Sequence, residues 1–555
     1  MAVSSLLFSS IPTGAPSSKV APLSRAAPCR RIAPAARVAS AGRAELAAAS
    51  VALAPAGART VDLAIDTNVA RIPYTDDVIL PLKRSDFPEG FAFGTSTSAY
   101  QIEGGTDSRG KSAWDYFTHT YPDKIVKGQS GDTACDSCRL YMDDIRLMKE
   151  MNADSYRFSI SWSRILPTGK KSGGISQEGI DYYNDVIDGL LANNITPYVT
   201  LLHVDRPHSL EEEYKGFLSS KMIDDFKDLA DICFEKFGDR VKHWMTLNEP
   251  RVYAAFGYSN GLMAPGRCSS WQQDYGCIAG DSGTEPYTVG HNLLLAHAAV
   301  VDLYRNNYQA KQDGKIGIAF DSTWFVPNTE SEKDQKAAER ALDFHLGWFL
   351  EPVKSGDYPA SMRELVGSRL PKFDESEAKS LKGSYDFIGL NYYTSQFASD
   401  VPEVTTPVSY VTDHHCKLDY FRGDTPIGLA SASGMYVYPK GLRDLLCYVK
   451  KNYNDPEIYI TENGYAELDD PFAPVEEACM DINRIDYIYK HLYHLHSAIT
   501  KDEVNVKGYF AWSLLDNFEW SSGYNLRFGL HYTDYMNLKR FPKYSARWLK
   551  QFLSQ

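Results

Sequence analysis

Two glutamates stand in matching surroundings at distant points of the chain. Glu249 lies in TLNEP (246–250) and Glu462 in ITENG (460–464), each beside an asparagine and directly after a stretch typical of a buried strand. A single glutamate is most often a solvated surface charge. Two carboxylates that face each other across one opening, however, suit the cleavage of a glycosidic bond, in which one protonates the leaving oxygen and the other meets the positive sugar carbon.

The neighbours expected for the two glutamates differ. Arg157, within another predicted strand, and the hydroxyl of Tyr393 are available to hold Glu462 as an anion. Glu249 has no cation near it in the sequence, so burial can raise its pKa. We therefore expect Glu249 to be the acid and Glu462 the nucleophile. Once a covalent bond consumes the charge on Glu462, Glu249 becomes easier to deprotonate and can activate water.

A further set of residues has the chemistry of a sugar pocket. A pyranose needs directional polar groups and flat apolar faces. The polar groups are Gln101, His203, Asn248 and Glu519, and the flat faces are Trp512 and Trp520. Each of them singly could also be a core residue. A carboxylate aimed at the 4- and 6-hydroxyls would repel a 6-phosphate, so Glu519 disfavours phosphorylated sugars.

Eight short apolar stretches recur along the chain and alternate with helical patterns. They span residues 91–94, 155–161, 195–202, 242–247, 315–320, 385–390, 457–461 and 506–512. Nearly continuous apolar strands that alternate with helices are typical of a parallel sheet buried on both faces. The pattern predicts an α/β fold, a single-domain (β/α)8 TIM barrel, and an open doubly wound sheet is disfavoured because no GxGxxG follows the first strand.

In such a barrel the chemistry sits where the strands end, because the following loops converge over one face. The candidate residues named above lie at or near these ends, and Asn391 follows the sixth strand beside Tyr393. Two connections, 250–291 and 395–435, are each about 40 residues long, and loops of that length are usually functional. We therefore predict long βα loops that wall the barrel mouth.

The motifs together resemble glycoside hydrolase family 1 from about Phe87 to the C-terminus. They are GTSTSAYQIEGG (94–105), YRFSISWSRILP (156–167), TLNEP, LNYYTS (390–395), ITENG and WSLLDNFEW (512–520). The chain most resembles plastid β-glucosidases of grasses that release defence aglycones such as benzoxazinoids. Myrosinases of this family lack the acid glutamate, so the presence of Glu249 makes thioglucosides a less suitable substrate.

The resemblance implies a (β/α)8 barrel, retention at the anomeric carbon, no metal and no cofactor. It implies that Glu249 is the acid/base and Glu462 the nucleophile. The glucose contacts that it implies are Gln101, His203, Asn248, Tyr393, Trp512, Glu519 and Trp520. A metal site of His203, Asp205 and His208 was the alternative for the cluster after the third strand, but no other strand offers a further His or Asp to it.

Several positions depart from the family pattern. Val204 stands where the family has Trp, and it is followed by the unusual Arg206 and His208. Loss of an indole from a pocket wall costs about 2 to 4 kcal/mol if nothing refills the space. Gly434 replaces a Trp that stacks on the aglycone in plant relatives, which suggests a wider aglycone site. Ser137 and Cys138 also replace larger residues.

The first 50 residues are rich in Ala, Ser, Pro and Arg, with six basic residues and one acidic residue, Glu45. This composition is typical of a plastid transit peptide, and a secreted or vacuolar protein is the alternative. The segment carries +5 of the total of −13, so the remainder carries −18. An acidic surface argues against nucleic acids and anionic membranes as partners, and no apolar run is long enough for a membrane span.

We therefore expect a transit peptide over residues 1–50, an N-terminal extension over 51–86 and a catalytic domain over 87–555. The expected function is a retaining β-glucosidase acting on the β-D-glucoside of a small plant metabolite. A transglucosidase with the same residues is one alternative, and a catalytically impaired glucoside-binding or assembly protein is another. Homo-oligomers are possible. Cys268 and Cys277, nine residues apart in a polar loop, could form a disulfide or remain free thiols.

Overall fold

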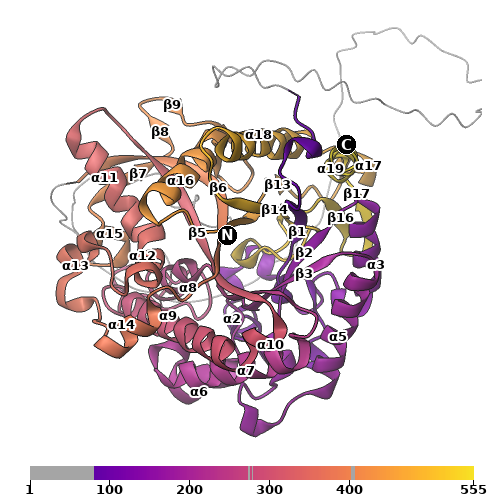
Figure 1. The fold of residues 1–555 in the computed structure, drawn as a ribbon, viewed down its shortest axis with the longest axis horizontal. Coiled ribbons are helices and arrows are strands. Elements are labelled where there is room, and N and C mark those ends of the chain that lie inside the picture. Colours follow the sequence, from indigo (N-terminus) through magenta and orange to yellow (C-terminus); the bar gives the residue numbers. More distant parts are fainter. Residues whose placement is uncertain (1–80, 273–275, 278, 402–406) are drawn as a thin grey trace, which may run out of the picture. The chain divides into compact units, whose positions relative to one another are not determined.

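The structure, a computed structural model, describes residues 81–555 except 273–275, 278 and 402–406. Eight parallel strands form a closed barrel, because β12 pairs with both β6 and β14, and β14 pairs with β1. The strands are β1 (Ala92–Ser96), β2 (Ser155–Ser159), β3 (Thr196–Leu202), β4 (His243–Asn248), β5 (Lys315–Pro327), β6 (Phe387–Asp400), β12 (Ile458–Asn463) and β14 (Val506–Trp512). The predicted (β/α)8 TIM barrel is confirmed, with a strand at each of the eight apolar stretches (Figure 1).

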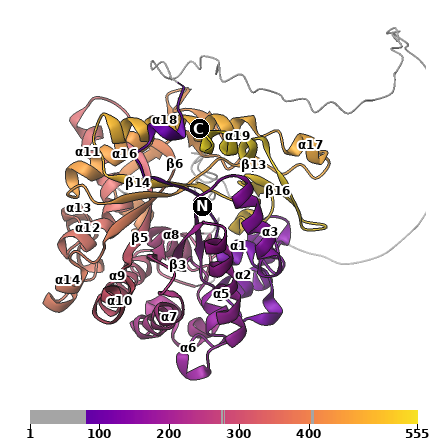
Figure 2. The same cartoon turned by 45° about the vertical axis from the view of Figure 1, so that its right-hand side comes forward.

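Helices lie between consecutive barrel strands and outside them (Figures 1 and 2). The main ones are α3 (Ser137–Glu150), α5 (Gln177–Ala192), α7 (Lys221–Phe237), α9 (Glu285–Tyr304), α11 (Glu332–Leu342), α12 (Trp348–Ser355), α16 (Pro439–Asn452) and α18 (Ile482–Thr500). In α5, Ile180, Tyr183, Ile187 and Leu190 are buried at helical spacing. The next residue, Leu191, is 39% exposed, since it lies one residue beyond the buried face.

The lower part of the barrel interior is filled by side chains from seven of the eight strands. This cluster consists of Ala92, Tyr198, Met245, Ala319, Phe387, Tyr459 and Phe510. Most of these residues lie towards the starts of their strands. The packed base leaves polar groups at the carboxyl ends of the strands, where the loops gather.

The two connections predicted as long loops contain regular structure. Helix α8 (Pro250–Tyr258) follows β4 after one residue, because Pro250 occupies its first turn. Strand β6 continues to Asp400 and pairs antiparallel with β7 (Cys416–Asp419). The irregular part of each connection is therefore shorter than the sequence suggested.

Beyond β14, a hairpin of β16 (His531–Asp534) and β17 (Lys539–Pro542) leads into α19 (Tyr544–Leu553). At the other end, Arg84 donates to Asp154 at 2.5 Å. The predicted transit peptide and residues 51–80 lie outside the described residues. No helix in the described part of the chain combines the length and apolar character needed to span a bilayer.

Candidate active site

Glu462 lies near the end of β12 and is fully buried. Its Oε1 accepts a hydrogen bond from Arg157 Nη1 at 2.6 Å, and its Oε2 accepts one from the Tyr393 hydroxyl at 2.8 Å. Burial raises the pKa of Glu462, while the Arg157 guanidinium and the Tyr393 hydroxyl act to lower it. Both carboxylate oxygens are thus held by the two groups that the sequence predicted for this purpose.

Glu249 has different neighbours. It is fully buried at the turn between β4 and α8, with a left-handed φ of 46°. Its Oε1 accepts a hydrogen bond from Asn391 Nδ2 at 2.6 Å, and among the described residues its Oε2 has no partner. Burial raises the pKa of Glu249 well above its ordinary value, and the negative charge of Glu462 raises it further. The geometry therefore favours a protonated Glu249 beside an ionised Glu462.

Two asparagines link these groups. Asn248 Oδ1 accepts from Arg157 Nη2 at 2.5 Å and from Asn391 Nδ2 at 3.1 Å, and Asn248 Nδ2 lies 3.1 Å from His203 Nε2. Asn391 in turn accepts a hydrogen bond from the Thr461 hydroxyl. Sequence reasoning placed Asn391 at the barrel mouth but gave it no role. Its contact with Glu249 reaches from β6 to the end of β4, with β5 between the two strands, and the motif alone does not reveal it.

His203 presents a free donor. Burial lowers the pKa of His203 well below its ordinary value, so the ring is neutral. Since Nε2 faces the Asn248 amide, the proton belongs on Nδ1, which has no partner in the described part of the chain. The ring is nearly parallel to two indoles, with centroids 5.9 Å from Trp512 and 6.1 Å from Trp520.

Gln101 and Glu519 lie together beyond these rings. Gln101 Nε2 is 3.4 Å from Glu519 Oε2, and it also donates to Asn517 Oδ1 and to the Phe518 carbonyl. Ser98 donates to Gln101 Oε1 at 2.6 Å. Gln101 is thus oriented by the segment that carries Glu519. Asn517, which sequence reasoning left without a role, anchors this contact.

Two of the departures from the family pattern, Val204 and Gly434, have unusual backbone conformations. Val204 is buried and has a left-handed φ of 58°, which a β-branched residue rarely adopts. Gly434 has a φ of 77°, which favours glycine, and it precedes Met435, which packs with Tyr393 and Trp512.

In the ranges that the structure describes, no group of three or more His, Cys, Asp or Glu side chains is arranged to hold a metal ion.

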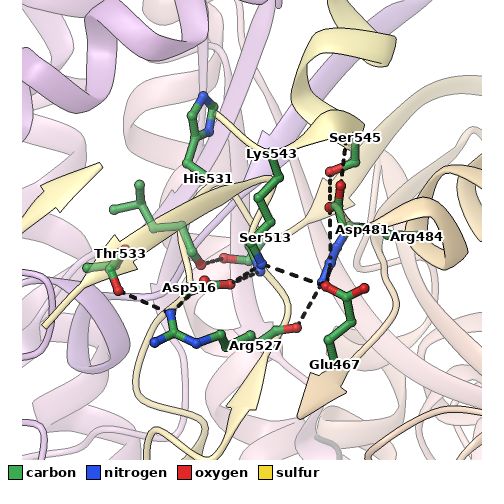
Figure 3. A network of polar contacts seen from close by, with 12 residues as sticks. Glu467, Asp481, Arg484, Ser513, Asp516, Arg527, His531, Thr533, Lys543 and Ser545 are labelled. Atoms are coloured by element: carbon green, nitrogen blue, oxygen red, sulfur yellow. Dashed lines mark hydrogen bonds and ion pairs between the residues drawn. The ribbon is translucent and has the colours of Figure 1, made fainter. Parts of the chain in front are cut away.

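A buried cluster of charges lies behind the segment 512–520 (Figure 3). Asp516 accepts hydrogen bonds from Lys543 Nζ and Arg527 Nη1, each at 2.8 Å, and from the Gly529 amide. The side chains of Asp516 and Lys543 are fully buried. Burial acts to raise the pKa of Asp516, but Lys543 and Arg527 bring it below its ordinary value. Asp516 is therefore an anion that depends on these cations.

The cluster extends to two helices. Arg484, on α18, pairs with Glu467 at 2.9 Å and with Asp481 at 3.4 Å. Asp481 also accepts from the backbone amide of Ser545 at the start of α19. Figure 3 shows these side chains converging from separate segments. Through Asp516 and the adjacent Asn517, the cluster fixes the segment that carries Trp512, Glu519 and Trp520.

Residues 83–555 match the model of glycosyl hydrolase family 1. The chain belongs to this family. It is 55% identical over 480 residues to β-glucosidase 11 of Oryza sativa subsp. japonica, covering 86% of this chain and 90% of that protein. It is 52% identical over 492 residues to raucaffricine-O-β-D-glucosidase of Rauvolfia serpentina, covering 84% and 91%. The crystal structure of the rice β-glucosidase Os3BGlu6 has a TM-score of 0.84 and 48% identity, covering 86% of this chain and all of that one.

These relationships confirm the predicted enzyme class, a retaining β-glucosidase that acts on O-glucosides. They also confirm the family resemblance in its coarser form, a plant-type β-glucosidase of this family. Cys268 and Cys277 are joined by a disulfide with their Cα atoms 5.2 Å apart, within the usual range for such a bond.

Lys543→Met tests the buried cluster. Removal of the cation leaves Asp516 underpaired in a dry environment, so we expect the free energy of unfolding to fall by about 3 to 5 kcal/mol. We also expect KM for a glucoside to rise more than kcat falls, because the segment expected to contact the sugar loses its anchor. Urea unfolding and steady-state kinetics would measure both.

Lys440→Met is the matched control, because Lys440 forms a surface pair with Asp444 and its side chain is 53% exposed. This change should cost less than about 1 kcal/mol. The double variant Lys543→Met/Asp516→Asn should recover part of the lost stability. Equal destabilisation by the two lysine changes would contradict the role of the cluster.

Proposed function

We propose that Glu249 is the acid/base and Glu462 the nucleophile of this β-glucosidase. The observation that carries the proposal is the contrast between their contacts. Both oxygens of Glu462 are held by Arg157 and Tyr393, whereas the Glu249 side chain accepts one hydrogen bond within the described part of the chain, from the neutral Asn391. A nucleophile must be ionised and an acid must be protonated near neutral pH, and these surroundings favour those two states.

In the first step, a Glu462 oxygen attacks the anomeric carbon while the bond to the aglycone oxygen breaks. The proton of Glu249 passes to that oxygen, and a covalent glucosyl ester remains on Glu462. In the second step, Glu249 takes a proton from water, the resulting hydroxide oxygen bonds to the anomeric carbon, and the ester bond breaks. Loss of the negative charge on Glu462 in the first step lowers the pKa of Glu249 for the second.

The proposed glucose contacts follow from the same site. His203 Nδ1, Glu249 Oε2 and Trp520 Nε1 are buried polar atoms without a described partner, and sugar hydroxyls or the glycosidic oxygen would satisfy them. Gln101, Asn248 and Glu519 supply further polar groups, and Trp512 and Trp520 supply apolar faces. A variant of the rice enzyme Os3BGlu6, similar to this chain with a TM-score of 0.83, was solved in a covalent complex with glucose.

For the aglycone, we propose a small plant metabolite held in a site widened at Gly434. Similar proteins named for their substrates include raucaffricine-O-β-D-glucosidase and furostanol glycoside 26-O-β-glucosidase, so relatives with comparable identity bear the names of different aglycones. A defence glucoside such as a benzoxazinoid is the specific candidate, on the resemblance to grass enzymes.

Hydrolysis of aryl β-D-glucosides tests the assigned roles. Glu462→Gln should abolish turnover. Glu249→Gln should slow it by about 10² to 10⁴-fold for poor leaving groups and much less for good ones, because only poor leaving groups need the proton. Glu332→Gln, at a solvent-exposed glutamate on α11, is the matched control and should leave the rate unchanged.

The pH dependence of kcat/KM should be bell-shaped. Activity falls at low pH as Glu462 gains a proton, and at high pH as Glu249 loses its proton. Since burial raises the pKa of both groups, both limbs should lie above the ordinary range of a glutamate. Glu249→Gln should remove the alkaline limb, and an unchanged limb would contradict the assignment.

Product analysis in the same assay separates the alternatives. Transfer of glucose to an added alcohol in preference to water would indicate a transglucosidase. Binding of glucose without turnover by the natural chain would indicate a pocket impaired at Val204. The joint retention of Glu249, Glu462, Arg157 and Tyr393 supports a catalytically competent pocket over an impaired one.

Gly434→Trp tests the aglycone site. An added indole should lower KM severalfold for flat aromatic glucosides and raise it for bulky ones. Gly434→Ala is the matched control, since at a φ of 77° it shares the backbone strain without the ring. If the natural chain already binds flat aromatic glucosides as tightly as Gly434→Trp does, the site is not widened.

We propose import into plastids on the composition of residues 1–50. The Cys268–Cys277 disulfide favours the alternative, because disulfides persist chiefly in oxidising compartments such as the secretory pathway. A fluorescent protein fused to residues 1–80 should accumulate in chloroplasts of plant cells. Accumulation in the vacuole or outside the cell would overturn the proposal.

A further inference from the structure

Arg206 and His208, which depart from the family pattern, take no part in the glucose pocket. They follow β3 and lead into α6 (His208–Tyr214), which contacts α2 (Ala113–Thr120). Beside these helices lies a cleft of about 280 Å³. It is lined chiefly by Tyr116, Phe117, Tyr121, His208, Glu212 and Arg267.

Arg206 links the two helices beside the cleft. It is fully buried, pairs with Glu211, and lies 5.4 Å from the ring centroid of Tyr253. Its carbonyl accepts a hydrogen bond from the Ala113 amide at 2.8 Å, and the His208 amide donates to Lys111 at 2.9 Å. These backbone bonds join the starts of α2 and α6, so the walls of the cleft are fixed relative to each other.

His208 supplies a directed polar group. Its residue surface is 8% exposed, and its ring stacks on Tyr116 with a centroid distance of 3.9 Å. Nε2 of His208 has no hydrogen-bond partner in the described ranges, although Glu212 Oε1 lies 3.5 Å away. Burial lowers the pKa of His208, which keeps the ring neutral at physiological pH. A neutral ring nitrogen beside a carboxylate offers a hydrogen-bonding pair to a hydroxyl group.

Two of the charged side chains that line the cleft, Arg267 and Glu211, are paired. Arg267 pairs with Glu285, and Glu211 pairs with Arg206. The Glu212 side chain is 70% exposed, and Tyr116 is 40% exposed. With its cation neutralised the cleft does not suit an anion, whereas a flat ring, a carboxylate and a neutral imidazole suit an uncharged polyol with one apolar face.

The cleft is separate from the glucose pocket. None of its lining residues belongs to the set around Glu249 and Glu462. Trp114, on α2, packs with a centroid distance of 4.7 Å against Trp520 of the glucose pocket, while Tyr116 and Phe117 of the same helix line the cleft. Helix α2 thus contributes to both.

We propose that this cleft is a second carbohydrate-binding site, which binds one uncharged pyranose unit. Since His208 covers one face of the Tyr116 ring, the sugar lies at the open edge of this stacked pair, and its hydroxyls reach His208 Nε2 and the Glu212 carboxylate. The proposal is independent of the catalytic roles assigned to Glu249 and Glu462, because it requires no bond to be broken.

Calorimetric titration of the full-length protein with D-glucose, together with crystals soaked in D-glucose, tests the proposal. We expect two binding events and a glucose ring in the cleft. Tyr116→Ala should weaken the second event by about tenfold, the upper size for loss of one ring contact. Glu212→Gln should weaken it too, and both variants should keep the parent rate of hydrolysis.

Tyr141→Ala, at a partly exposed tyrosine on α3, is the matched control and should leave both binding events unchanged. A single binding event that Tyr116→Ala does not alter would overturn the proposal, as would a cleft that binds phenol but not glucose. Loss of hydrolysis in the parent, with binding in the cleft retained, would count against the proposed catalytic function alone.

Discussion

The site depends on one buried cation. Arg157 is fully buried on β2, and its guanidinium reaches Glu462 on β12 with one nitrogen and Asn248 on β4 with another. A buried guanidinium without polar partners lowers the free energy of unfolding by several kcal/mol. The strands that supply them are not neighbours of one another, so the requirement can be met only when the barrel is closed. Closure of the barrel therefore also supplies the cation that favours ionisation of Glu462, the proposed nucleophile.

A second group of buried charges positions the residues that are proposed to contact the sugar. Asp516, Lys543 and Arg527 are held together where water is excluded, and the chain between Trp512 and Trp520 is fixed by them. The proposed glucose contacts therefore depend on segments far from the two carboxylates. This explains why a segment as irregular as 513–519 can present Glu519 and two indoles in fixed positions without regular secondary structure of its own.

Much of this could be predicted from the sequence, for physical reasons that differ between residues. The barrel followed from eight apolar stretches, because strands buried on both faces carry that signature. The glutamate pair followed from position, since each stands at a strand end beside an asparagine. Asn391, Asn517 and Lys543 could not be assigned, because a partner chosen by strand register or by a distant hairpin leaves no local pattern. The extent of β6 was missed because its pairing with β5 and β7 carries the strand into a segment that looks like a loop, and α8 was missed inside the connection predicted to be a loop.

The left-handed backbone at Glu249 has a consequence for how an acid can also serve as a base. Most buried carboxylates are kept in place by ion pairs, and an ion pair favours one charge state over the other. Glu249 is placed instead by its φ of 46° and by Pro250 at the start of α8, with a single neutral side-chain partner in the described structure. The main chain thus fixes the position of Glu249, and the main-chain conformation does not depend on whether the carboxyl group is protonated. A carboxyl group held in this way can lose and regain its proton in each catalytic cycle without an ion pair being broken and formed again.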